Sequence, residues 1–108
     1  MAGPSPEGSG LRHIVLLRAI PEAATAERDR IEEALAMLVA DAAIGLNGSL
    51  QRDLGLRPES DRAATWVASI DFDSVHGFSS YLASEQHVRF LREFGPQLET
   101  VLAIQIPN

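Results

Sequence analysis

Alternating hydrophobic and polar positions predict four β-strands along this chain. The segment LRHIVLLRAI is rich in branched apolar residues and stops at Pro21. In AATWVASIDFD, every second residue from Trp66 to Phe72 is apolar, which is the period of a strand with one buried face. Glycine and asparagine punctuate a shorter alternating segment, GLNGSLQRDLGL, and Pro107 follows ETVLAIQI. We expect strands at residues 11–20, 63–73 and 99–106, and a short strand within residues 45–56.

Helical periodicity replaces this alternation in two regions. The first region repeats apolar residues every three or four positions and carries acidic residues in its early turns, as an amphipathic helix does. In the second region two serines precede short helical stretches, and serine is a favoured N-cap because its hydroxyl accepts a hydrogen bond from a free backbone N–H. Gly95-Pro96 then ends this region. We expect helices at residues 25–42, 74–82 and 84–94, with Thr25, Ser74 and Ser84 as their N-caps.

The order of these elements is β-α-β-β-α-β, in which four antiparallel strands carry helices on one face. This order predicts an α+β, ferredoxin-like subunit. The first strand nevertheless has apolar side chains on both faces, with His13, Val15 and Leu17 on one face and Ile14 and Leu16 on the other. Helices cover only one face of such a sheet. We therefore expect the second face to pack against another copy, forming a homodimer and a dimeric α+β barrel.

Length and composition limit the chain to one domain and exclude several partners. It has 108 residues, no cysteine and a formal charge of −6, and its nine basic residues are all arginine. Scattered arginines on an acidic chain disfavour nucleic acids and anionic membranes, and no apolar run approaches the roughly 20 residues of a membrane-spanning helix. The lack of cysteine removes disulfides and thiolate-bound metals. We expect residues 1–10 to be a flexible leader, residues 11–108 to be a single domain, and the location to be cytoplasmic.

Several stretches together resemble the stress-responsive A/B barrel (Dabb) family of dimeric α+β barrel proteins. They are RHIVLLR in the first strand, RDLGL after the second, VASIDFDS before the second helical region, and then YLASEQHVRF and GPQLETVL; the match covers residues 12–106. The resemblance implies a pocket between sheet and helices and a dimer formed through the sheet face. A plant member of the family is a cofactor-free polyketide cyclase that closes a ring by aldol condensation. Other members are known only as stress-induced proteins.

The resemblance also implies where a site would lie. His87 falls on the catalytic histidine of the cyclase, Tyr81 on its catalytic tyrosine, and His13 on a pocket histidine. The implied function is a cofactor-independent cyclase or lyase that acts on a polyketide-like carbonyl substrate. His87 would remove an acidic proton, and Tyr81 would stabilise the oxygen that becomes negative, without a metal or other cofactor. The expected substrate-binding residues are His13, Val15, Leu17, Trp66, Phe78, Phe90 and Phe94.

Tyr81 and His87 can cooperate only if the helix between them is interrupted. Six positions at about 100° each point two side chains of one continuous helix toward different faces. A junction at Ala83-Ser84, with Ser84 capping the second helix, lets the chain turn and bring both groups to one cavity. The break at Ser84 is therefore a condition of the enzymatic hypothesis.

Two other classes of function stay open on the sequence alone. The first is a non-catalytic, dimeric stress-responsive or ligand-binding protein, in which side chains fill the cavity and Tyr81 and His87 pack locally. The second is a haem-binding or monooxygenase-like barrel, for which a histidine without supporting pocket residues is a weak signal.

Two further groups of charged residues have simpler interpretations. Asp71 and Asp73 lie at a strand end, where solvated or capping acids are commoner than cation sites. Three arginines near the second hairpin could steer an anionic substrate, but a solvated face explains them as well. These are Arg52, Arg57 and Arg62.

Overall fold

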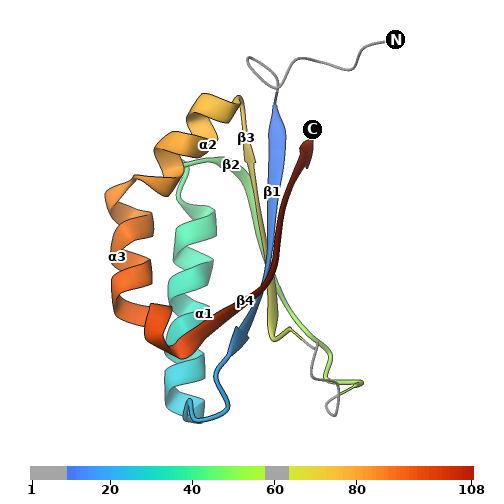
Figure 1. The fold of residues 1–108 in the computed structure, drawn as a ribbon, viewed down its shortest axis with the longest axis vertical. Coiled ribbons are helices and arrows are strands. Elements are labelled where there is room, and N and C mark those ends of the chain that lie inside the picture. Colours follow the sequence, from blue (N-terminus) through green and yellow to red (C-terminus); the bar gives the residue numbers. More distant parts are fainter. Residues whose placement is uncertain (1–9, 58–63) are drawn as a thin grey trace.

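The computed structural model describes residues 10–57 and 64–108 and confirms the expected order of elements (Figure 1). Residues 1–9 of the expected leader and Arg62 lie outside the described residues. The strands are β1 (Leu11–Ala19), β2 (Leu46–Arg52), β3 (Trp66–Phe72) and β4 (Leu98–Pro107). The helices are α1 (Thr25–Ala40), α2 (Val75–Leu82), α3 (Glu85–Phe94) and the short 3-10 helix η1 (Gly95–Gln97).

The four strands form one antiparallel sheet, and the helices cover one of its faces (Figure 1). The strand order is β2-β3-β1-β4, as in a ferredoxin-like fold. His13 on β1 lies opposite Ile70 on β3 and opposite Gln105 on β4, so these three side chains share a face. The pairing of β1 with β4 shifts between Leu16 and Leu17, so that β4 contains one additional residue at this point.

The sheet face beneath the helices forms the hydrophobic core. Every second residue of β3 points into it, and none of them is more than 7% exposed, as the alternation predicted: Trp66, Ala68, Ile70 and Phe72. From the other side, α1 contributes the apolar stripe of Ile31, Leu35 and Leu38. The helix-covered face is therefore the one that both sequence periodicities indicated.

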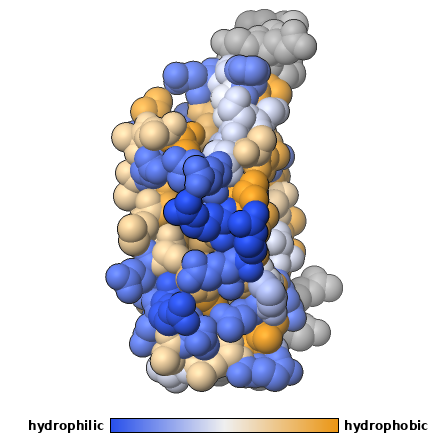
Figure 2. Space-filling model, turned by 90° about the vertical axis from the view of Figure 1, so that its left-hand side faces the viewer, coloured by the Kyte–Doolittle hydropathy of each residue, from blue (hydrophilic) through white to orange (hydrophobic). Residues whose placement is uncertain are grey.

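The opposite face of the sheet carries no helix and presents apolar side chains. Leu102, Ile104 and Ile106 on β4 are 54%, 44% and 36% exposed. Their neighbours across the ladder include Ile14 and Leu16 of β1, which are half-buried. On the helical side, by contrast, hydrophilic residues spread over much of the surface (Figure 2). An uncovered apolar sheet face of this kind is typical of an interaction surface.

Several element boundaries differ by a few residues from those expected, and two of these differences change the role or the exposure of a residue. Thr25 is the first residue of α1 and not its N-cap, because the first helical hydrogen bond, from the N–H of Arg28, closes on the carbonyl of Ala24 at 3.0 Å. The second strand spans Leu46–Arg52 and so occupies only the first part of the segment 45–56. As a result Leu54 is 85% exposed in the following loop.

Asp71 is a buried ion-pair residue and not a solvated acid at the end of a strand. Its side chain is enclosed on β3, and Arg12 of β1 donates to its two carboxylate oxygens at 2.8 and 3.2 Å. Asn47 donates a further hydrogen bond at 3.0 Å. These hydrogen bonds, that of Arg12 above all, lower the pKa of Asp71 to about 2 in spite of its burial.

This ion pair predicts a pH-dependent part of the stability. Because the pKa of Asp71 is lower in the folded than in the unfolded chain, its contribution is complete above about pH 4 and is lost as the pH falls toward about 2. We expect Asp71→Asn to lower the free energy of unfolding by about 2 kcal/mol near neutral pH and by much less near pH 2. Urea unfolding at several pH values measures this, with the exposed Asp73→Asn as control. A loss that does not change with pH would contradict the assignment.

Candidate active site

Two serine caps divide the second helical region, as the sequence predicted. The Ser74 hydroxyl accepts a hydrogen bond from the N–H of Gly77 at 3.0 Å and starts α2. The Ser84 hydroxyl accepts one from the N–H of His87 at 3.2 Å and starts α3. Ala83 still has a helical conformation, but Ser84 is extended, with φ −66° and ψ 151°. The helix therefore breaks at Ser84.

The break brings the two candidate catalytic side chains together. The ring centroids of Tyr81 and His87 lie 4.7 Å apart, whereas a continuous helix would direct these residues to different faces. His13 joins them from β1, with its ring centroid 6.1 Å from that of Tyr81. Three polar residues from three separate elements thus meet at one place.

The cap at Ser84 predicts a measurable effect on stability. We expect Ser84→Ala to lower the free energy of unfolding by about 1 kcal/mol, because the N–H of His87 loses its acceptor. Ser80→Ala at an exposed position in the last turn of α2 is the matched control and should be neutral or slightly stabilising, since alanine is the better helix former. Urea unfolding compares the two variants. Equal effects would show that Ser84 does not act as a cap.

A cavity of about 260 Å³ lies between the sheet and the helices, and the three rings line it. Val15, Leu17 and Phe90, three of the residues expected to bind substrate, also line this cavity. Most of its remaining wall is aliphatic and comes from α1, β3 and α3. Within the part of the chain that the structure describes, Thr100 of β4 is the one other polar residue on the wall. The cavity is therefore apolar with one polar end, as small-molecule sites commonly are.

His87 is oriented by a backbone carbonyl that the helix break leaves free. Its Nδ1 lies 3.0 Å from the carbonyl oxygen of Leu82, the last residue of α2. A carbonyl oxygen only accepts hydrogen bonds, so Nδ1 carries the proton of the neutral ring and donates it. Nε2 then keeps its lone pair. His87 is thereby arranged as a base at Nε2.

Tyr81 is arranged as a hydrogen-bond donor. Its side chain is buried, and burial raises the pKa of the phenol to about 12, so the hydroxyl keeps its proton at neutral pH. Among the described residues, no group hydrogen-bonds to this hydroxyl, and the one enclosed side-chain polar atom without a partner is Oε1 of Gln97. The Tyr81 hydroxyl is therefore not sealed in the core, and the space that it meets is the cavity.

His13 is buried and makes its side-chain hydrogen bond to the edge strand β4. Its Nδ1 lies 2.9 Å from Nε2 of Gln105 on that strand. Burial, and secondarily the nearby His87, lowers the pKa of His13 below its ordinary value. The ring is therefore neutral at neutral pH.

The sequence model of the stress-responsive A/B barrel domain, Dabb, matches residues 11–108. The chain belongs to the Dabb family. This Dabb domain is similar to a dimeric ferredoxin-like protein of unknown function from Thermobifida fusca, with 26% identity, 94% of this chain and 92% of that chain covered, and a TM-score of 0.77. It is also similar to a hydroxynitrile lyase from Passiflora edulis, with 24% identity, 94% of each chain covered and a TM-score of 0.76.

A third solved structure, a Dabb family protein with a ferredoxin-like fold from Mesorhizobium loti, is 18% identical to this Dabb domain. The alignment covers 93% of this chain and 95% of that chain, with a TM-score of 0.69. A comparison with curated proteins found no match. The comparisons therefore confirm the ferredoxin-like α+β fold of the Dabb domain, and its similarity to proteins described as dimeric.

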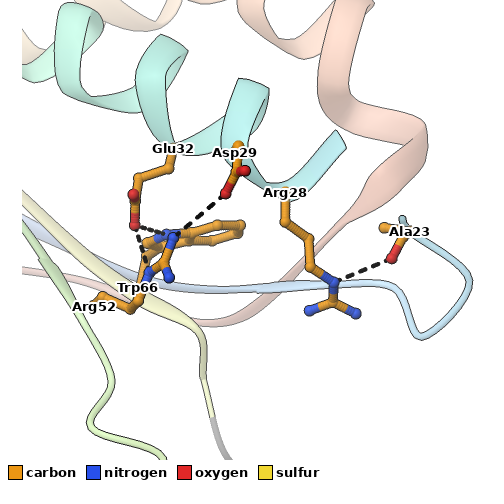
Figure 3. Close-up of polar contacts among 6 residues, drawn as sticks. All are labelled: Ala23, Arg28, Asp29, Glu32, Arg52 and Trp66. Atoms are coloured by element: carbon orange, nitrogen blue, oxygen red, sulfur yellow. Dashed lines mark hydrogen bonds and ion pairs between the residues drawn. The ribbon is translucent and has the colours of Figure 1, made fainter. Parts of the chain in front are cut away.

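Three aromatic residues that were expected to bind substrate lie outside the cavity wall of the Dabb domain: Trp66, Phe78 and Phe94. Trp66 is in the core, and its Nε1 donates to Glu32 of α1 at 2.9 Å (Figure 3). Arg52 donates to the same carboxylate at 2.7 Å, so it links β2 to α1 and is engaged away from the cavity (Figure 3). Phe78 packs against the ring of His13, with centroids 4.9 Å apart, and so supports the site indirectly.

The described residues of the Dabb domain also limit other kinds of site. Within residues 10–57 and 64–108, no three histidine, aspartate or glutamate side chains gather closely enough to hold a metal ion. None of the described helices is long and apolar enough to cross a membrane. What the described residues do assemble is an apolar cavity bordered by the side chains of His13, Tyr81 and His87.

Proposed function

We propose that this Dabb domain is a cofactor-independent enzyme of cyclase or lyase type, which makes or breaks a carbon–carbon bond next to a carbonyl carbon. The observation that supports this most is the pairing of His87 and Tyr81 on one apolar cavity, with ring centroids 4.7 Å apart. The free Nε2 of His87 supplies the base, and the phenol of Tyr81 supplies the hydrogen-bond donor.

In the bond-forming direction, Nε2 of His87 removes a proton from the carbon beside a carbonyl group, and Tyr81 donates a hydrogen bond to the enolate oxygen. The enolate carbon attacks a second carbonyl carbon, and the π electron pair of that carbonyl group moves to its own oxygen, which becomes an alkoxide. The imidazolium of His87 then returns the proton to that alkoxide. In the reverse direction, His87 removes the hydroxyl proton, the carbon–carbon bond breaks, and the departing carbanion takes the proton back.

One relative supports the lyase direction of this chemistry. The Passiflora edulis structure, 24% identical to this chain, is a hydroxynitrile lyase. Loss of a hydroxyl proton followed by carbon–carbon cleavage requires one base and donors to the carbonyl oxygen that forms. The residues that line this cavity can provide both groups.

The size of the cavity supports a small substrate. A volume of about 260 Å³ is below the roughly 300–1,000 Å³ of sites for drug-sized ligands. Its aliphatic wall favours an apolar ring or a short chain, and the three rings at one end favour a carbonyl or hydroxyl group there. We propose a small aromatic or short-chain carbonyl compound with an acidic proton.

We propose further that the domain works as a homodimer joined through the uncovered sheet face. Leu102, Ile104 and Ile106 on that face are at least 36% exposed in the single chain. A relative 26% identical is described as dimeric, which supports the same assembly. The cavity lies on the helical side of the sheet, so the dimer would leave it accessible.

Exchange of protons in D₂O tests the first step of the proposed reaction without knowledge of the natural substrate. Wild-type protein is incubated with a linear β-diketone, a β-hydroxy ketone and an aromatic cyanohydrin, and NMR follows loss of the α-proton signal or release of the carbonyl product. We expect one class to react faster than in buffer, and the rate to depend on His87. Binding of these compounds without any exchange or cleavage would reject the enzyme in favour of the alternative below.

The second candidate is a non-catalytic ligand-binding protein, which the aliphatic wall favours. An apolar cavity retains a small hydrophobic ligand without chemistry, and most residues on this wall cannot take part in proton transfer. In that case ligands would shift the NMR signals of Tyr81 and His87 but would be recovered unchanged.

A further inference from the structure

Gln105 on β4 is a polar side chain that the proposed reaction does not use, yet it contacts the site. The pairing of β1 with β4 sets Gln105 directly opposite His13, and its Nε2 lies 2.9 Å from Nδ1 of His13. An amide NH₂ group donates hydrogen bonds and does not accept them. Nδ1 of His13 is therefore the acceptor, and the proton of the neutral ring belongs on Nε2.

The Nε2 atom of His13 points away from Gln105, because the two nitrogens lie on different sides of an imidazole ring. Among the described residues, no group hydrogen-bonds to this atom, although the ring is only 8% exposed. It is also not one of the enclosed polar atoms without a partner, and His13 lines the cavity. Its N–H therefore opens toward the space that Tyr81 and His87 share.

The two histidines of the cavity thus have opposite hydrogen-bonding roles. His87 donates from Nδ1 to the Leu82 carbonyl and keeps a lone pair on Nε2. His13 accepts at Nδ1 from Gln105 and keeps a proton on Nε2. While the Leu82 carbonyl and the Gln105 amide stay in place, His87 keeps its proton on Nδ1 and His13 keeps its proton on Nε2.

We propose that Gln105 is a positioning residue that holds His13 as its Nε2–H tautomer, so that His13 and Tyr81 together donate to one substrate oxygen. The inference rests on the proposed function only for the identity of that oxygen, the carbonyl oxygen on which negative charge develops. Two donors that converge on one oxygen stabilise such a charge without a metal ion. Burial, which keeps His13 neutral, makes this role available at neutral pH.

The tautomer is measured directly by ¹⁵N NMR of the histidine rings, in full-length protein without any substrate, at a pH where both rings are neutral. We expect protonated Nε2 in His13 and protonated Nδ1 in His87. Gln105→Glu keeps the shape of the side chain but offers only acceptors, so His13 should change to the Nδ1–H tautomer. Gln105→Met keeps the length without a hydrogen bond and should give a mixture. Gln51→Glu, the same change at an exposed position of β2, should leave His13 as in the wild type.

Either of two results would overturn the proposal. One is an Nδ1–H tautomer of His13 in the wild type, and the other is a tautomer that does not change in Gln105→Glu and Gln105→Met. Because no substrate is present, the result does not depend on whether the protein is an enzyme. In the proton-exchange assay we further expect Gln105→Glu to lower kcat by about tenfold or more with little change in KM. If Gln105 had only a structural role, activity would fall without any change in the tautomer of His13.

Discussion

Replacement of His87 by glutamine is expected to lower kcat for proton exchange by about 10² or more while the fold is retained. Glutamine fills a similar space and can still donate to the Leu82 carbonyl, which accepts from Nδ1 of His87 in the wild type. It has no basic nitrogen, so only the proton transfer is removed. The measurement is the rate of α-proton exchange together with the free energy of unfolding of the same sample.

His76 provides a matched control for this substitution. It is an exposed histidine on α2 that lies outside the cavity wall, so His76→Gln should leave the exchange rate unchanged. Activity that survives in His87→Gln would rule out His87 as the base. If His87→Gln instead unfolds, the fold needs the imidazole ring itself, and Tyr81→Phe, which removes only the donor, then tests the site.

Replacement of Ile104 by aspartate is expected to convert a dimer into a monomer. In the single chain Ile104 is 44% exposed on the uncovered sheet face, so a carboxylate there costs little before association. In a dimer joined through this face the same charge would be buried without a partner, which costs several kcal/mol. Light scattering coupled to size-exclusion chromatography, over a range of protein concentrations, measures the change in mass.

Val88→Asp is the control that introduces the same charge at a position away from the uncovered sheet face. Val88 lies on α3 and is 40% exposed, close to the value for Ile104, but it is on the helical side. This variant should keep the wild-type mass. Circular dichroism distinguishes dissociation from unfolding, and Leu102→Asp gives a second variant on the same face. A wild-type protein of monomer mass at all concentrations would refute the proposed dimer.

The fold followed from local patterns that act over a few residues. The alternation from Trp66 to Phe72 predicted the buried face of β3, and the apolar stripe of α1 predicted the side of this helix that packs on the sheet. The hydroxyls of Ser74 and Ser84 mark two helix starts because capping needs only a backbone N–H three residues away. The serine caps therefore predicted the helix break that brings Tyr81 close to His87.

The residues around the site were less predictable because they depend on strand register. Gln105 meets His13 only because β4 pairs with β1 in one particular register, which includes a shift beside Leu17. Asp71 is buried for the same kind of reason, since Arg12 lies directly opposite it on β1. Neither pairing leaves a local signal, because the partners are 92 and 59 positions apart in sequence.

The aromatic residues of the expected pocket show a second limit of the sequence. Trp66 and Phe94 are apolar positions on the correct faces, and periodicity indicates that they are buried. It does not say whether a buried ring borders empty space or other side chains. In this chain Leu35, Leu38 and Val39 of α1 line the cavity instead, and helical periodicity indicates only that such positions face the core.

The additional residue in β4 has a consequence for how this strand can change in evolution. Beyond it, Ala103 and Gln105 face the cavity side, while Leu102, Ile104 and Ile106 face the open side. A single inserted or deleted codon in this stretch would exchange the two sets, turning Gln105 outward and directing an isoleucine toward His13. We therefore expect the stretch to tolerate substitutions among similar side chains but to keep its length fixed.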